Sequence, residues 1–225
     1  MAKLITIEGT DCSGKKTQSD LLVKRLKSEG KRIEKLSFPM YDTPTGRIVG
    51  GPYLGKKHIC EGFFPEGATN VNAKTASTYF GVDRFENSPK ILELLNNNTN
   101  VLLDRYVESN MAHQGGKLFT AEERLALYNW LERLEYGLYE LPKPDFTIFL
   151  HLPYEYALEL KKNREEAPDQ HEASPEHLIN AEKAYLELAE LYGFNHINCV
   201  SNGSIRTEED IHEEVYSLVK RKINK

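Results

Sequence analysis

Cysteine is scarce in this chain, and its distribution excludes two classes of protein. The three cysteines, Cys12, Cys60 and Cys199, lie far apart in the sequence. They form no Cys-x-x-Cys pair and are odd in number, so they suit neither a disulfide framework nor a zinc-finger pattern. His58 lies close to Cys60, but two ligands without further close ones do not make a metal site. The sequence therefore predicts a reduced protein, which we expect in the cytoplasm.

Long hydrophobic runs and an excess of positive charge are also missing. No apolar stretch approaches the roughly 20 residues of a membrane-spanning helix. The chain enters its first strand at once, so we expect no signal peptide. With 29 Lys and Arg residues against 34 Asp and Glu residues, the formal net charge is −5. That charge argues against general binding to nucleic acid or to a membrane surface.

Predicted strands and helices alternate along the chain. Aliphatic and β-branched runs predict strands at 3–8, 32–38, 101–104, 145–150 and 196–200. Helical spacing predicts helices at 18–27, 73–86, 89–96, 121–139, 154–163, 175–192 and 208–222. Ser88 is placed to cap the helix that Pro89 begins, and Thr120 the next one, with Glu123 three residues on. The alternation predicts an α/β fold in which helices cover both faces of a five-stranded parallel sheet.

The strongest motif follows the first strand. It leads directly into the first predicted helix and reads Gly9-Thr10-Asp11-Cys12-Ser13-Gly14-Lys15-Lys16-Thr17. This layout is typical of a phosphate-binding loop, in which backbone N–H groups encircle an anion and Lys15 reaches the terminal phosphates. The motif normally continues with Ser or Thr, whose hydroxyl helps to hold magnesium; here Lys16 takes that position and Thr17 follows. A glycine-rich turn with an ordinary surface lysine is the alternative.

A second candidate group ends the third predicted strand, in Val101-Leu102-Leu103-Asp104-Arg105-Tyr106. Ligands of parallel sheets bind beyond the carboxyl ends of the strands, so we expect Asp104 and Arg105 near the phosphate loop. The carboxylate of Asp104 would orient magnesium or its water. The planar guanidinium of Arg105 would bridge the donor and acceptor phosphates. A structural ion pair at a strand end is the alternative.

Two long connections, at residues 43–72 and 164–174, are candidates for lids that keep water from a phosphoryl transfer. Near the second connection, Lys161 and Arg164 are placed to offset the charge of the transferred group, with Arg164 as the first candidate. A solvated basic helix end is the alternative interpretation.

Together these motifs resemble the thymidylate kinases. Members of that family join a Gly-x-Asp-x-x-Gly-Lys loop to an Asp-Arg-Tyr strand end, as this chain does. Further matches are Ser37-Phe38-Pro39, Tyr79-Phe80-Gly81-Val82-Asp83-Arg84, Ser109-Asn110 and Gln114-Gly115. The resemblance covers nearly the whole chain. It implies a three-layer P-loop NTPase-type fold in one domain, 1–225, with a lid at about 161–174 and a monophosphate-binding loop region at about 38–72.

The resemblance also implies residue roles in binding dTMP. Phe80 would stack on the thymine ring, Arg84 would donate to its carbonyl at position 4, and Asn110 would contact its N3 edge. Asp11 would accept a hydrogen bond from the 3′-hydroxyl, and Arg105 would hold the acceptor phosphate. Phe80 and Arg84 are four residues apart and so share a helix face. The alternative is that Phe80 belongs to the core and Arg84 pairs with a neighbouring acid.

The remaining implied roles concern the two nucleotides and the metal. The loop from Gly9 to Thr17 would hold ATP, with Lys15 catalytic, and the adenine would lie near residues 202–206. Asp104 and Thr17 would hold Mg²⁺. Tyr41 would line the monophosphate pocket, and Gln114 and His113 would also belong to the substrate-binding residues.

The sequence departs from the family at two places. Met40 and Tyr41 follow Phe38-Pro39 where the family often has an arginine that holds the phosphate, and Arg47 is the candidate replacement. His113 stands where the family usually has an aromatic residue that crowds out a ribose 2′-hydroxyl.

The predicted reaction is transfer of the γ-phosphoryl of ATP to dTMP, giving dTDP and ADP for dTTP synthesis. The resemblance also implies a homodimer, and the apolar positions at 92–95 are candidates for its interface, with a place in the core as the alternative. A monophosphate kinase for another base and a deoxynucleoside kinase are the alternatives. The latter needs a carboxylate base, for which Asp42 and Glu8 are candidates. A nucleotide-sensing binding protein is the alternative from another class, although the sequence has no Asn-Lys-x-Asp guanine motif.

Overall fold

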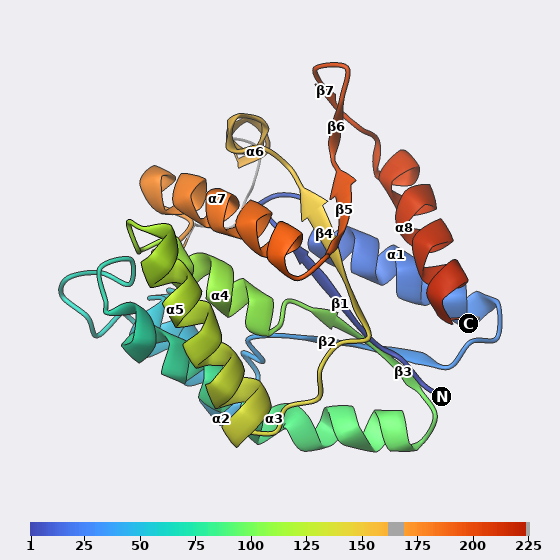
Figure 1. Cartoon of the computed structure of the whole chain (residues 1–225), viewed down its shortest axis with the longest axis horizontal. Helices are drawn as coiled ribbons and strands as arrows, with labels where there is room; N and C mark the ends of the chain where they lie inside the picture. The colour runs from blue at the N-terminus through green and yellow to red at the C-terminus, as the bar shows by residue number, and fades with distance from the viewer. Residues whose placement is uncertain (162–168, 224–225) are drawn as a thin grey trace.

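The protein is built around one five-stranded parallel sheet, seen in a computed structural model that describes residues 1–161 and 169–223 (Figure 1). The strands are β1 (Leu4–Gly9), β2 (Ile33–Ser37), β3 (Asn100–Asp104), β4 (Phe146–His151) and β5 (Asn195–Asn198). Their order in the sheet is β2-β3-β1-β4-β5. The predicted α/β fold with a five-stranded parallel sheet is therefore confirmed.

The strand order decides where a ligand can bind. The chain passes from β1 to the edge strand β2 and back to β3, and then crosses to β4 and β5 on the other side of β1. A crevice forms at such a switch point, outside the carboxyl ends of the strands. In register, Ile7 of β1 pairs with Asp104 at the end of β3. The sheet therefore brings the loop after β1 beside Asp104.

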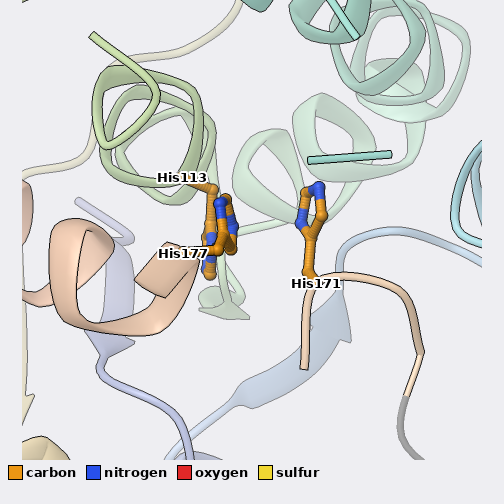
Figure 2. A group of neighbouring side chains, drawn as sticks. All are labelled: His113, His171 and His177. Carbon is orange, nitrogen blue, oxygen red and sulfur yellow. The ribbon is translucent and has the colours of Figure 1, made fainter. Parts of the chain in front are cut away.

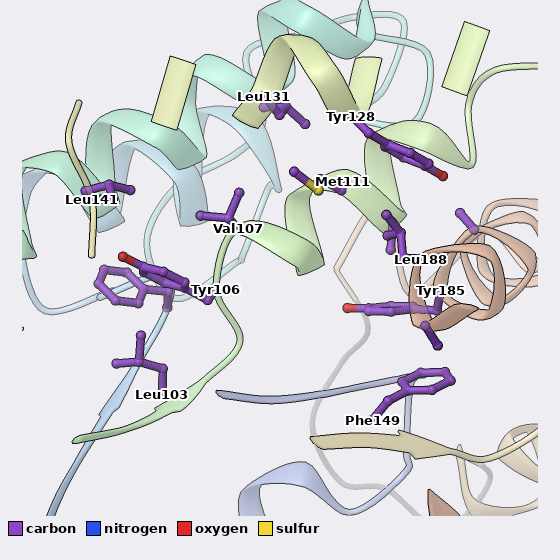
Figure 3. Close-up of a cluster of buried hydrophobic side chains, with 14 of the residues drawn as sticks. Leu103, Tyr106, Val107, Met111, Tyr128, Leu131, Leu141, Phe149, Tyr185 and Leu188 are labelled. Carbon is purple, nitrogen blue, oxygen red and sulfur yellow. The ribbon is translucent and has the colours of Figure 1, made fainter. Parts of the chain in front are cut away.

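Helices cover both faces of the sheet because each strand places apolar side chains on both faces. Ile5, Ile7 and Leu102 face α1 (Lys15–Ser28) and α8 (Glu208–Ile223). Leu103 and Phe149 face the opposite layer, in the cluster shown in Figure 3. That layer consists of α3 (Ala73–Asn96), α4 (Val107–Gly115), α5 (Ala121–Leu131) and α7 (Pro175–Leu191). The result is the three-layer arrangement that the family resemblance implied.

Two helix predictions need correction. Residues 73–96 form one helix, α3, and Ser88 is not a cap. Pro89 lacks the N–H that would bond the carbonyl of Phe85, and the hydroxyl of Ser88 donates to that carbonyl instead, at 2.8 Å. The predicted helix at 121–139 ends as an α-helix at Leu131 and continues as the π-helix η2 (Glu132–Leu138). The Thr120 cap is confirmed, with a complete capping box to Glu123.

The segment 43–72 is more structured than a bare loop. It contains α2 (Pro44–Ile48) and the π-helix η1 (Val49–Tyr53). It also has an apolar cluster of its own, in which Val49, Tyr53, Ala68 and Val71 are buried. Such packing gives this wall of the site a defined shape.

The remaining elements differ from the sequence prediction at their ends. Helix α4 was not predicted at all. β5 ends at Asn198, and the two-stranded hairpin β6 (Val200–Ser201) and β7 (Ser204–Ile205) follows it. Helix α6 (Tyr154–Lys161) is described as far as Lys161. Within residues 1–161 and 169–223, no helix has the length and apolar character needed to cross a bilayer.

Candidate active site

The phosphate loop has the open backbone that an anion site requires. Cys12 and Gly14 adopt left-handed conformations with φ of 58° and 79°. Gly14 is the N-cap of α1, and no side chain in the described part of the chain caps that helix start. The N–H groups of its first turn, with the positive end of the helix dipole, are therefore free to receive a phosphate. A side chain at Gly9 would meet the carbonyl of Leu150 at 2.5 Å, so the loop needs glycine there.

Lys15 lies folded across this loop. Its Nζ donates to the carbonyl oxygens of Gly9 at 3.0 Å and Thr10 at 2.7 Å. Burial and the positive charge of Arg105 lower the pKa of Lys15 to about 8. A phosphate would replace the lost solvation of this ammonium group, so Lys15 is suited to bind one.

The lowered pKa of Lys15 predicts how activity depends on pH. If Lys15 holds the ATP phosphates, as the family resemblance implies, binding needs its protonated form, which declines as the pH rises through about 8. We expect kcat/KM for ATP to fall above that pH, measured with dTMP saturating. A Lys15→Arg variant keeps its charge, so its residual activity should not show this fall. A flat wild-type profile between about pH 7 and 10 would contradict the role of Lys15.

The turn after β3 is fixed from beneath by Glu8, which is fully buried. The carboxylate accepts hydrogen bonds from the backbone N–H of Tyr106 at 2.7 Å and from the hydroxyls of Ser109 and Tyr185. Burial raises its pKa. Arg105 at the top of this turn has φ of 67°, a conformation that a non-glycine residue needs support to hold. Glu8 is therefore engaged in shaping the turn, which argues against its use as a base for a nucleoside hydroxyl.

Arg105 is held loosely by several partners. Its guanidinium donates to Asp11 and to His113 Nε2 at 3.3 Å, and to Ser109 and Tyr185 at 3.4 Å. All four distances are long for charge-assisted hydrogen bonds. Burial raises the pKa of Asp11, but Arg105, Lys15 and Lys161 outweigh it, and the net pKa is lowered. A phosphate within reach would offer this guanidinium shorter charge-assisted bonds than any of these four contacts.

One cavity of about 630 Å³ joins these groups to the predicted base-binding residues. Its volume lies in the usual range for small-ligand sites. Most of the predicted site residues line it, namely Asp11, Cys12, Ser13, Gly14, Lys15, Lys16, Thr17, Tyr41, Phe80, Arg84, Asp104, Arg105, Asn110, His113 and Gln114. Gly9 and Thr10 lie in the loop but do not line the cavity. Arg164, predicted as the lid cation, lies outside the described residues.

Arg84 of α3 and Asn110 of α4, two of the predicted base-binding residues, meet over a buried acid. Glu135 of η2 accepts from Arg84 Nε at 2.5 Å and from its terminal NH2 group at 2.7 Å. Asn110 Nδ2 donates to the same carboxylate at 3.1 Å and to the carbonyl of Ser77 at 3.2 Å. Arg84 therefore pairs with an acid, as the alternative interpretation held, and still lines the cavity.

Asn110 presents one unsatisfied atom. Its Oδ1 is buried and accepts no hydrogen bond from the described residues. The network assigns the amide orientation, because both groups that face Nδ2 are acceptors and could not face an oxygen. A buried acceptor without a donor is unfavourable, so Oδ1 suits a ligand that carries an N–H group.

The loop after β2 is organised by Asp83, also of α3. This buried carboxylate accepts from the backbone N–H of Met40 at 2.9 Å and from the hydroxyl of Thr45 at 2.8 Å. Arg47, the predicted replacement for the missing arginine, is exposed and does not line the cavity. Lys35 and Lys56 do line it, although each is paired with an acid, Lys35 with Asp20 and Lys56 with Asp169. By position they are better candidates than Arg47.

The cavity is bounded on another side by the segment before α7. Lys161 Nζ lies 3.6 Å from Asp11 Oδ2 and donates to the carbonyl of Glu172 at 3.1 Å. His171 lines the cavity beside His113. His171 was not predicted from the sequence as a site residue, nor were Glu8 and Glu135 as supporting acids. No local motif marks these residues, because their partners lie far away in the chain.

Comparison with known proteins places this architecture in a family. A model of the thymidylate kinase family matches residues 7–215. The chain belongs to the thymidylate kinase family. The human thymidylate kinase is 35% identical over 149 residues, which cover 66% of this chain and 60% of that protein. The thymidylate kinase of Schizosaccharomyces pombe is 30% identical over 217 residues, covering 96% of this chain and 91% of that protein.

A solved structure agrees with this family assignment. The thymidylate kinase from Candida albicans superposes with a TM-score of 0.75 at 25% identity and covers 99% of this chain and 93% of that one. The thymidylate kinase resemblance drawn from the sequence motifs is therefore confirmed.

Proposed function

We propose that this cavity transfers the γ-phosphoryl of ATP to dTMP, giving dTDP and ADP. The chain is a kinase of the thymidylate kinase family, and its reaction supplies dTDP for dTTP synthesis. The observation that carries the choice of base is the orphaned Oδ1 of Asn110 beside the guanidinium of Arg84. Thymine offers an N3–H donor next to a carbonyl acceptor. This pattern is complementary to the Oδ1 acceptor of Asn110 next to the guanidinium donor of Arg84.

The proposed binding of dTMP uses the residues that line the cavity. Phe80 stacks on the base, and Arg84 donates to the carbonyl at position 4 with N–H groups that Glu135 does not engage. Asp11 accepts from the 3′-hydroxyl. Arg105 holds the acceptor phosphate, with Tyr41 and Gln114 at the same wall.

ATP binds at the other half of the proposed site. The loop from Gly9 to Thr17 encircles its phosphates, and Lys15 offsets the charge that spreads over the transferred group. Positioning and electrostatic stabilisation carry the catalysis, since phosphoryl transfer leaves little for a nucleophilic side chain to do. In the proposal, Arg164 and Lys161 contribute positive charge from the lid.

Asp104 and Thr17 are the proposed ligands of Mg²⁺. Both line the cavity, and a carboxylate with a hydroxyl is the kind of hard oxygen donor set that Mg²⁺ takes alongside phosphate oxygens. When bound, the ion would neutralise charge on the ATP phosphates. Lys16 occupies the usual hydroxyl position and is exposed, so the hydroxyl has to come from Thr17.

A panel of monophosphates tests the choice of base. We expect dTMP to be consumed with a kcat/KM at least about 100-fold above that of dCMP, because cytosine presents an acceptor at N3 and an amino group at position 4. In an Asn110→Leu variant the difference should shrink, mainly through loss of dTMP activity. Equal rates with dCMP and dTMP would overturn the assignment of base while leaving the reaction class intact. ADP release that requires added dTMP excludes a mere nucleotide sensor.

A homodimer in the cytoplasm remains a proposal. It rests on the family resemblance and on the reduced cysteines. Of the predicted contact region, Leu92 is 42% exposed, whereas Leu94 and Leu95 pack against the core. Light scattering of the purified protein decides the oligomeric state, and a monomer at micromolar concentration would contradict the dimer.

A further inference from the structure

Three imidazoles meet at one wall of the cavity, although they come from separate elements. His113 lies on α4, His171 in the turn before α7, and His177 in the first turn of α7 (Figure 2). One ring nitrogen from each lies within 4.8 Å of those of the other two. None of the phosphate or base contacts proposed above uses His171 or His177.

The rings are in the state that a metal ion needs. Desolvation through burial lowers the pKa of His177 to about 4 and holds the pKa values of His113 and His171 well below their ordinary range. Burial thus favours the uncharged form of each ring, in which one ring nitrogen carries a lone pair.

Hydrogen bonds orient two of the rings from outside the cluster. The Tyr53 hydroxyl donates to the carbonyl of Ala68 at 3.0 Å, so it accepts from His171 Nε2 at 2.9 Å. His171 Nδ1 is then the lone-pair nitrogen. Arg105 can only donate, so His113 Nε2 accepts its contact at 3.3 Å, and His113 Nδ1–H donates to His177 Nε2. Ligating histidines in proteins are commonly held by such outer partners.

The spacing of His113 and His177 also suits tetrahedral coordination. His113 Nδ1 and His177 Nε2 are 3.2 Å apart. Two ligands at zinc–nitrogen distances of about 2.0–2.1 Å in a tetrahedron are about 3.3 Å apart. A metal ion between them would replace the shared hydrogen, and His113 would carry its proton on Nε2 instead, with no net proton release.

We propose that His113, His171 and His177 form a binding site for Zn²⁺ or a similar divalent transition metal. Three imidazoles select such ions over Mg²⁺, which prefers oxygen ligands. The ion would join the segment before α7 to α4. Its fourth coordination position is left for water or a ligand in the cavity.

The charges around the cluster determine how a bound metal would affect the binding of dTMP. Arg105, Lys15 and Lys117 lie on this side of the cavity, and Asp11 and Asp169 are the nearby acids. Burial lowers the pKa of Lys117 to about 7, so its ammonium group readily gives up its proton. Arg105 would face the Nε2–H of a metal-bound His113 and would have to turn away. Bound metal should therefore weaken dTMP binding, a consequence that rests on the proposed role of Arg105.

Cobalt binding tests the site without any use of activity. Tag-free protein, stripped with chelator and free of Mg²⁺, is titrated with Co²⁺ while its visible d–d absorption is recorded. We expect the intense band of four-coordinate Co²⁺ in the wild type, abolished by stoichiometric Zn²⁺. A His177→Gln variant should bind at least about 100-fold more weakly, since even an outer partner is worth 10–100-fold. Exposed His58 provides the matched control, and His58→Gln should bind as the wild type does.

Two results would overturn the site: no four-coordinate band in the wild type, or equal affinity in the wild type and His177→Gln. Circular dichroism checks that His177→Gln is folded, and His171→Gln replaces it if it is not. The effect of bound metal on dTMP binding is tested separately, through the KM for dTMP. Zn²⁺ should raise this KM in the wild type but not in His177→Gln. An unchanged KM would refute the competition with Arg105 and leave the spectroscopic result standing, and absence of any kinase activity would refute the proposed function alone.

Discussion

Replacing Lys15 with alanine is expected to lower kcat by about 10³-fold while the fold stays intact. Lys15 lies within the loop that we propose encircles the ATP phosphates, and removal of one preorganised donor commonly costs 10²–10³-fold in rate. Its burial lowers its pKa, which shows that the folded protein stabilises this charge poorly without a ligand. Loss of the side chain should therefore cost little stability. Steady-state kinetics with saturating dTMP measure the rate, and thermal unfolding measures the fold.

Lys24 on the same helix supplies the control for this prediction. It is exposed and points away from the cavity, so Lys24→Ala should keep both rate and stability. A Lys15→Ala variant that retains wild-type kcat would show that the loop does not hold the transferred phosphate. A variant that fails to fold is distinguished by its unfolding curve, and Lys15→Met, which keeps the apolar stem, then takes its place.

The phosphate side of this site could be predicted from the sequence because its parts are local. Gly9 to Thr17 are contiguous, and a strand, a glycine turn and a helix are each encoded within a few residues. Asp104 was placed beside the loop by one topological rule, that ligands bind at the carboxyl ends of parallel strands. The register of Ile7 against Asp104 bears out that placement.

The supporting residues could not be predicted because their partners are distant in the chain. Glu135 lies in a stretch that the sequence presents as one long helix, where nothing distinguishes it from Glu132. Only the fold brings it to Arg84, 51 residues away. His171 and His177 likewise meet His113, although they lie 58 and 64 residues further along the chain. Helix α4 was missed because its apolar residues are mixed with the buried polar residues Glu108, Ser109 and Asn110, of which the last two line the cavity.

Removing Glu135 is expected to have the largest effect on stability of any change at this site. Arg84 and Glu135 have side chains exposed by only 3% and 0%. In Glu135→Ala the guanidinium stays buried without its partner, and breaking a buried pair in this way costs about 3–5 kcal/mol. For a chain of this size that lowers Tm by about 6 °C or more. Calorimetry measures the shift, and Glu34→Ala, which removes an exposed partner of Lys27, should change stability by less than about 1 kcal/mol.

The double variant Arg84→Met/Glu135→Leu separates stability from recognition of the base. Apolar residues of similar volume can replace a buried ion pair without loss of stability, so this variant should regain most of the Tm lost in Glu135→Ala. It has no donor for the thymine carbonyl, and Asn110 Nδ2 has lost its carboxylate partner. Its KM for dTMP should therefore stay at least about tenfold above that of the wild type, from the loss of one hydrogen bond to a charged group. If the double variant recovers both stability and KM, the Arg84–Glu135 pair holds the fold together and takes no part in binding the base.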